Sequence, residues 1–146
     1  MGKPRVLFLC TGNSARSQMA EGLLRHLASD RFEVLSAGTH PVGVNTLAIE
    51  AMAEVGIDIS GHHSKNVTGF LGRPIEYVIT VCDRAKESCP VFPGTYKFLS
   101  WSLDDPAAAS GTHEDKLLVF RRIRDEITHH IEVQFALAAA AEKMPQ

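Results

Sequence analysis

The sequence has few cysteines, no excess of basic charge and no long hydrophobic run. Three cysteines among 146 residues is an odd number, which does not fit the paired framework of a small secreted protein. The formal net charge of −2 argues against a protein that holds nucleic acid through bulk positive charge. Apolar runs stay below the about 18 residues of a membrane span, so we expect no membrane partner. The N-terminus resembles a strand rather than a secretory leader, so we expect a cytoplasmic protein with reduced thiols.

Apolar runs and helical periodicities alternate along the chain. The apolar runs predict four strands, at 5–10, 33–38, 75–82 and 96–101. Helical spacing predicts a helix from about Ser17, a helix capped by Asn45, a short helix after the third strand, and a long one from about Thr112 to Ala141. The pattern indicates one α/β domain over residues 1–146, with a four-stranded parallel sheet in the order 2-1-3-4 and helices on both faces. Phe98 and Trp101 are expected in the core.

The segment 10–17 reads Cys-Thr-Gly-Asn-Ser-Ala-Arg-Ser, between the first strand and the first helix. Small residues allow backbone N–H groups to surround a tetrahedral oxyanion, and the helix N-terminus adds positive potential. The residues expected to bind the oxyanion are Thr11, Gly12, Asn13, Ser14, Ala15 and Arg16. Cys10 would be the nucleophile, and Ser17 could donate a hydrogen bond to its sulfur. The alternative is an ordinary turn after a buried cysteine.

This segment resembles the signature of the low-molecular-weight protein tyrosine phosphatase superfamily. The matching stretch is "VLFLCTGNSARSQMAEG" (6–22), and "SAG" (36–38) and Asp105-Pro106 also match. The resemblance implies that Asp105 is a general acid, which protonates the leaving oxygen. It also implies one of two activities: hydrolysis of phosphate monoesters through a phosphocysteine, or reduction of arsenate.

Two further cysteines, Cys82 and Cys89, favour the second activity. The stretch "CDRAKESCP" is similar to the redox segment of thioredoxin-coupled arsenate reductases. That resemblance implies a relay in which Cys10 attacks arsenate, Cys82 attacks the Cys10 sulfur, and Cys89 takes over the disulfide for thioredoxin to reduce. The substrate would be arsenate, with phosphate and sulfate as analogues. The carboxyl ends of neighbouring parallel strands meet at one edge, so we expect Cys82 to lie close to Cys10.

Two alternatives remain: a tyrosine phosphatase with incidental second and third cysteines, and a non-enzymatic oxyanion-binding or redox-sensing module. Phosphatases of this fold usually carry aromatic residues after Asp-Pro, which stack on the substrate ring. Three alanines (107–109) follow here, which favours a small inorganic oxyanion.

The spacing of Cys82 and Cys89 also has a geometric consequence. If residues 83–88 are helical, the two cysteines lie about 10 Å apart, from seven rises of about 1.5 Å. A disulfide needs Cα atoms within about 7 Å. We therefore expect residues 82–90 to unwind on oxidation and to form the docking site of the carrier.

No tightly bound cofactor is expected, and the histidine pairs lack zinc-ligand spacing with the cysteines. Some relatives bind a potassium ion beside the loop. Asn13, Glu21 and Ser36 match oxygen-ligand positions for that ion, whereas His63 and Lys65 do not look like oxygen ligands. Our hypothesis is that the Lys65 ammonium replaces the ion; a solvated surface lysine is the alternative.

Overall fold

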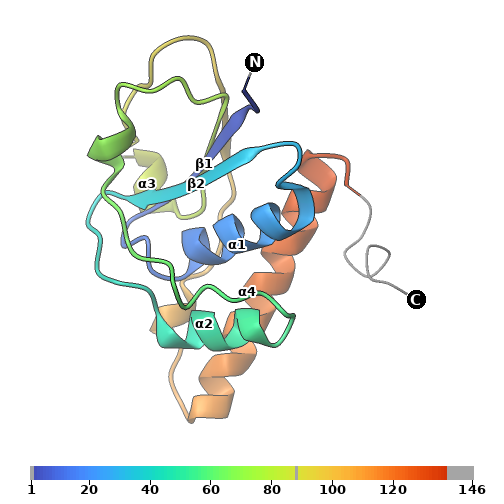
Figure 1. Ribbon diagram of the computed structural model, residues 1–146. Coiled ribbons are helices and arrows are strands. Elements are labelled where there is room, and N and C mark those ends of the chain that lie inside the picture. The colour runs from blue at the N-terminus through green and yellow to red at the C-terminus, as the bar shows by residue number, and fades with distance from the viewer. Residues whose placement is uncertain (1, 88, 138–146) are drawn as a thin grey trace.

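Four parallel strands form a single sheet in the computed structural model, which describes residues 2–87 and 89–137 (Figure 1). The sheet order is β2-β1-β3-β4, as predicted. The strands are β1 (Arg5–Cys10), β2 (Glu33–Gly38), β3 (Tyr77–Thr80) and β4 (Lys97–Ser100). In register, Cys10 pairs with Gly38 of β2, and Leu9 pairs with Thr80 of β3. The strand that ends in the expected nucleophile therefore lies in the middle of the sheet.

Helices cover both faces of this sheet. They are α1 (Arg16–Ala28), α2 (Thr46–Ala53), α3 (Asp83–Glu87) and α4 (His113–Gln134), with 3₁₀ turns η1 (Val67–Phe70) and η2 (Pro106–Ala108). α1, α2 and α4 pack together on one side, and α3 lies against β1 and β3 on the other (Figure 1). Right-handed crossovers place α1 and α3 on opposite faces, because the chain moves one way from β1 to β2 and the opposite way from β3 to β4. α2 lies in the connection from β2 to β3, but it packs against α1 and α4.

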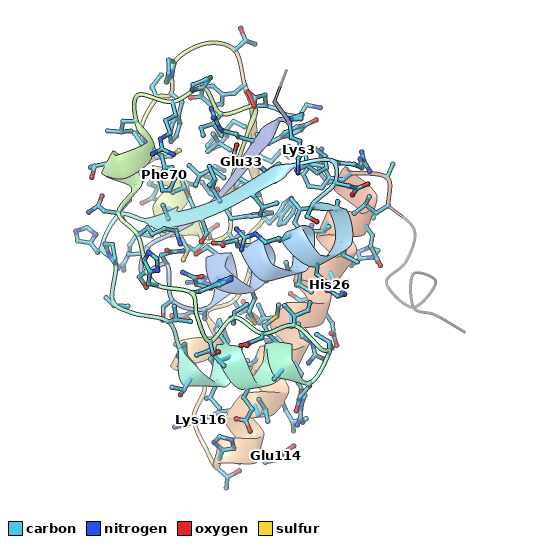
Figure 2. The ribbon with its side chains drawn as sticks, viewed as in Figure 1. Lys3, His26, Glu33, Phe70, Glu114 and Lys116 are labelled. Carbon is cyan, nitrogen blue, oxygen red and sulfur yellow. The ribbon has the colours of Figure 1, made fainter. Side chains whose placement is uncertain are left out.

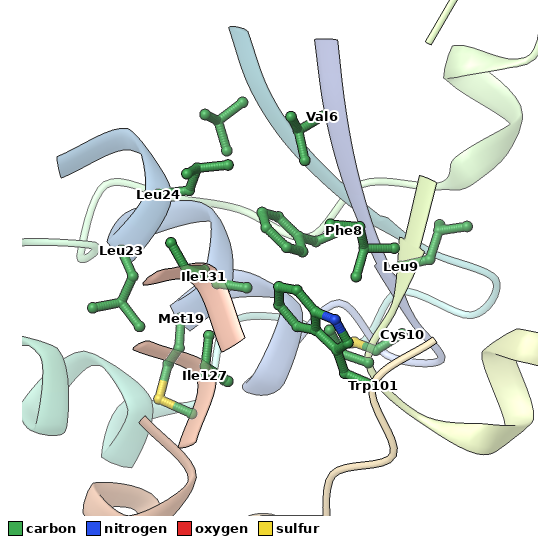
Figure 3. Close-up of a cluster of buried hydrophobic side chains, with 14 of the residues drawn as sticks. Val6, Phe8, Leu9, Cys10, Met19, Leu23, Leu24, Trp101, Ile127 and Ile131 are labelled. Atoms are coloured by element: carbon green, nitrogen blue, oxygen red, sulfur yellow. The ribbon is translucent and has the colours of Figure 1, made fainter. Parts of the chain in front are cut away.

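The core lies between the sheet and the α1–α4 pair. Phe8 on β1 is fully buried, and its ring lies 5.8 Å from that of Trp101, centroid to centroid. Figure 3 shows Met19 and Leu24 of α1 facing Ile127 and Ile131 of α4 around these rings. Charged side chains such as Lys3, Glu33 and Glu114 lie on the outside (Figure 2).

Side-chain caps mark the first residues of α2 and α4. The Asn45 side chain accepts from the amides of Leu47 and Ala48, as the predicted cap of α2. Thr112 caps α4 and forms a reciprocal capping box with Asp115.

Two expectations are wrong, one about the length of α4 and one about the burial of Phe98. α4 ends at Gln134, short of Ala141, because Ala136 adopts a left-handed φ of 52° and the Leu137 amide donates to the Glu132 carbonyl at 2.9 Å. These contacts form a Schellman motif, and residues 138–141 lie outside the described residues. Phe98 is 42% exposed because β4 is an edge strand, whereas Trp101 is buried as expected.

Strands β3 and β4 are also shorter than predicted. β3 ends at Thr80, so Cys82 lies two residues beyond the strand rather than at its last position. Among the described residues, no helix is both long and apolar enough to cross a membrane.

Candidate active site

A cavity of about 460 Å³ opens at the carboxyl ends of β1 and β3. Its walls come from four segments: the loop after β1, the chain around Val42, the start of α3, and the segment before η2. The residues at its floor and nearest walls are Cys10, Thr11, Gly12, Ser14, Ala15 and Arg16. The cavity therefore lies at the carboxyl ends of the strands, where ligands bind in open parallel sheets.

The sulfur of Cys10 faces two hydrogen-bonding groups. The Asn13 amide donates to it at 3.2 Å, and the hydroxyl of Ser17 lies 2.9 Å away. The Ser17 oxygen already accepts from the Asn13 side chain at 2.7 Å, so its own hydrogen is free to point at the sulfur. Cys10 is only 3% exposed, so these two groups are the polar neighbours that its sulfur meets inside the loop.

Asn13 lies behind the loop rather than in the cavity wall. Its φ is 47°, in the left-handed region that Asn tolerates well. Its side-chain oxygen accepts from the Gln18 side chain at 3.0 Å and from the Lys65 amide at 2.9 Å, and its side-chain nitrogen also donates to Ser36. The structure thus gives Asn13 a supporting position, while the other five expected oxyanion ligands line the cavity.

Arg16 and Asp105 approach each other across the cavity. The Arg16 guanidinium donates to the Leu103 carbonyl at 2.9 Å, and a second nitrogen lies 3.9 Å from the Asp105 carboxylate. Asp105 also accepts from the Ala107 amide at 3.0 Å, which caps η2 and orients the carboxyl group. Its side chain is half exposed, and Asp105 lies at the rim of the cavity.

The structure separates the two further cysteines. Cys82 lines the cavity, and its sulfur lies 3.6 Å from the Thr11 hydroxyl oxygen. Cys89 is not part of the cavity wall; its thiol points to the Pro90 carbonyl at 3.5 Å. Burial raises the pKa of the Cys89 thiol, so this group is held in its protonated form in the present conformation. All three thiols are free, and α3 occupies the chain between the second and third.

A buried carboxylate, Glu21, organises the polar groups behind the loop. The Ser36 hydroxyl donates to it, Arg25 lies 2.7 Å away, and the Lys65 ammonium lies 3.6 Å away. Burial alone would raise the pKa of Glu21, but the Ser36 hydrogen bond and the two cations outweigh it and lower the pKa. His62 also faces Glu21, at 3.9 Å.

The sequence analysis did not identify two residues of this polar network, Gln18 and His62, as part of the site. Gln18 is fully buried, and His62 reaches its side-chain oxygen at 2.9 Å. Gln18 could have been predicted, because it is a polar residue on the buried face of α1, where an apolar residue would be expected.

Comparison with known proteins decides the family. The sequence pattern of the family described as "Low molecular weight phosphotyrosine protein phosphatase" matches residues 5–144. The chain belongs to this family. An arsenate reductase of Shouchella clausii is 48% identical over 132 residues, which cover 90% of this chain and 95% of that protein.

Solved structures of the family agree with the observed fold. One described as "An arsenate reductase in the phosphate binding state" is 36% identical with a TM-score of 0.74, and the match covers 91% of this chain and 97% of that one. A thioredoxin-dependent arsenate reductase of Corynebacterium glutamicum is 32% identical with a TM-score of 0.65, and the match covers 90% of this chain and 63% of that one. The fold predicted from the sequence is confirmed.

Proposed function

We propose that this protein reduces arsenate to arsenite through its three cysteines, in the cytoplasm. The observation that carries the proposal is that Cys10 and Cys82 line one cavity, with Cys89 beyond the short helix that follows. A phosphatase needs only the first of these thiols. The similarity to proteins named arsenate reductase supports the same choice.

The first step forms a bond between sulfur and arsenic. The Cys10 thiolate attacks the arsenic of arsenate, while the loop amides and Arg16 hold the other oxygens. One arsenate oxygen departs as water, and the Asp105 carboxyl group at the rim of the cavity passes a proton to it. Arsenic remains in the +5 state in this adduct.

The second step transfers the electrons. The Cys82 thiolate attacks the Cys10 sulfur, and a Cys10–Cys82 disulfide forms as the sulfur–arsenic bond breaks. The bonding pair stays with arsenic, which leaves as arsenite in the +3 state. Two thiolates have then been oxidised and one arsenic reduced by two electrons.

The third step returns Cys10 to its starting form. The Cys89 thiolate attacks Cys82 and releases the Cys10 thiolate, leaving a Cys82–Cys89 disulfide. An external dithiol then reduces that disulfide by exchange. We propose thioredoxin as this donor, and the thioredoxin dependence of the Corynebacterium glutamicum relative supports the choice.

The wall of the cavity favours an inorganic substrate over a phosphotyrosine. Ala107 lies in the wall, and no aromatic side chain is among the residues that line the cavity in the described part of the chain. A substrate ring would therefore find no flat surface on which to stack.

We also propose that Lys65 takes the place of the potassium ion that some relatives bind. Its ammonium group lies 3.6 Å from the Glu21 carboxylate and donates to the His63 carbonyl at 2.9 Å. A monovalent cation placed among the same oxygens would meet this positive charge at close range, so the two exclude each other.

Cysteine substitutions test the proposed reaction. We expect Cys82→Ser and Cys89→Ser to lose arsenate turnover with a thioredoxin system, because the relay stops at the missing thiol. Both variants should keep the weak hydrolysis of an aryl phosphate that requires only the loop and Cys10, whereas Cys10→Ser should lose both activities. Undiminished arsenate turnover by either of the first two variants would contradict the relay.

A further inference from the structure

A segment that follows β2 runs along the outside of the oxyanion loop. The His40 amide donates to the Thr11 carbonyl at 2.8 Å, and the Val42 amide donates to the Gly12 carbonyl at 3.1 Å. Val42 itself is 74% exposed at the mouth of the cavity, so its backbone rather than its side chain holds it there.

The same pattern continues around the rest of the loop. The Asn45 amide donates to the Ser14 carbonyl at 3.0 Å. The Ser64 hydroxyl donates to the Asn13 carbonyl at 2.7 Å and accepts from the Gly43 amide at 2.9 Å. Four consecutive carbonyls, of residues 11 to 14, are therefore bonded on the side away from the cavity.

This outward bonding determines where the loop amides point. In a trans peptide the carbonyl of one residue and the amide N–H of the next lie in one plane and point in opposite directions. With carbonyls 11 to 14 turned outward, the amides of residues 12 to 15 turn inward. The bond from the Asn13 amide to the Cys10 sulfur, at 3.2 Å, agrees with this direction.

Gly38 lets β2 approach the loop closely enough for these bonds. A Cβ atom at position 38 would lie 2.5 Å from the Thr11 carbonyl oxygen and 2.8 Å from the Asn13 nitrogen. Both contacts are to backbone atoms of the loop, which cannot move aside as the end of a side chain can. Any residue larger than glycine must push the loop away from β2.

We propose that residues 38–45 together with Ser64 form a collar that presets the loop amides for a tetrahedral oxyanion. Gly38 and Ser64 are then positioning residues: neither lines the cavity, and each acts through the loop backbone. The inference rests on the proposed function in one respect, that the loop binds such an oxyanion. Preset amides favour binding because they need no reorganisation when the anion arrives.

Phosphate binding by the full chain, measured by calorimetry, tests the collar. We expect Ser64→Ala to weaken phosphate binding about threefold to tenfold, because the Asn13 carbonyl keeps only its longer bond from the Gln18 side chain, at 3.2 Å, and the Gly43 amide loses its acceptor. We expect Gly38→Ala to weaken it at least about tenfold, because the loop itself is displaced. Both variants should also raise the KM for arsenate more than they lower kcat, because they weaken binding of the anion, whereas a loss of global stability would lower kcat and leave KM unchanged.

Matched variants separate positioning from stability. Ser60→Ala removes a serine hydroxyl that bonds the Asp58 carboxylate and is not part of the collar, so this variant should bind phosphate like the wild type. Gly22→Ala places a Cβ 2.8 Å from Ile59 in the core, so it should lower the melting temperature without weakening phosphate binding.

Equal phosphate affinity of Ser64→Ala and Ser60→Ala would overturn the collar. If Gly38→Ala does not fold, this comparison is sufficient to test the proposal. A wild-type protein that binds no phosphate would contradict the proposed function itself, a result distinguishable from failure of the collar.

Discussion

Each donor to the Cys10 sulfur is itself held by a second hydrogen bond. Ser17 accepts from Asn13, and Asn13 donates in turn to Ser36, whose hydroxyl reaches the buried Glu21 carboxylate. A chain of side chains thus joins the nucleophile to the charge cluster that contains Lys65. Satisfied buried networks of this kind fix the geometry of a site more strongly than single contacts do.

A substitution of Lys65 tests whether its charge stands in for a metal ion. We expect Lys65→Gln to lower the free energy of unfolding by about 1 kcal/mol, because Glu21 loses a charged neighbour, and to make stability depend on potassium. The wild type should show no potassium dependence. Urea unfolding in potassium and in matched sodium salts provides the measurement.

The loss caused by Lys65→Gln should also depend on pH. The pKa of Glu21 is lowered in the folded protein, so its contribution is present above the unfolded value of about 4.3 and is lost as pH falls through the folded pKa. Wild type and variant should therefore converge in acid. Lys116→Gln, on α4, is the control and should show neither effect. A wild type stabilised by potassium would contradict the substitution of the ion by Lys65.

At the scale of elements, α3 is the segment that the proposed chemistry has to change. It spans five residues, Asp83–Glu87, directly after Cys82, and the Lys86 amide donates to the Cys82 carbonyl at 3.3 Å. A helix continued from Cys82 to Cys89 would hold the two thiols farther apart than a disulfide permits. Helices this short have little stability of their own, so local unwinding costs little.

Hydrogen exchange should report the unwinding. After one equivalent of arsenate, amides of residues 83–87 should exchange faster than in the reduced protein, while those of β1 stay protected. The Cys10→Ser variant is the control, because arsenate cannot oxidise it and its exchange should not change. Identical exchange across α3 in reduced and oxidised wild-type protein would show that the segment does not open.

The elements that could be predicted from the sequence are those with a local cause. β1, the loop and the start of α1 follow from one apolar run, one set of small residues and one helical stripe. Ser64 and Gln18 were not predicted, because each contacts the loop from a place that no local pattern marks. Helical spacing predicted α4 as far as about Ala141, but the Schellman motif after Gln134 ends the helix, and the spacing of apolar residues does not signal that backbone turn.

At the scale of the whole molecule, the order of the strands assembles the site. β1 lies between β2 and β3, so the loop after it receives the collar from one side and Cys82 from the other. α4 closes the α1 face, and the segment that carries Asp105 enters from β4. Cys10 and Cys82 are therefore far apart in the sequence but lie at the same edge of the sheet. Cys89 follows α3, beyond that edge.

The central claim is that electrons leave through three sulfurs that are bonded to one another in turn. Peptide mass mapping after a single equivalent of arsenate, without an external reductant, tests this claim most directly. The relay predicts one arsenite released per protein and a disulfide between Cys82 and Cys89, with Cys10 free. Arsenite released while Cys82 and Cys89 both remain free thiols would contradict it.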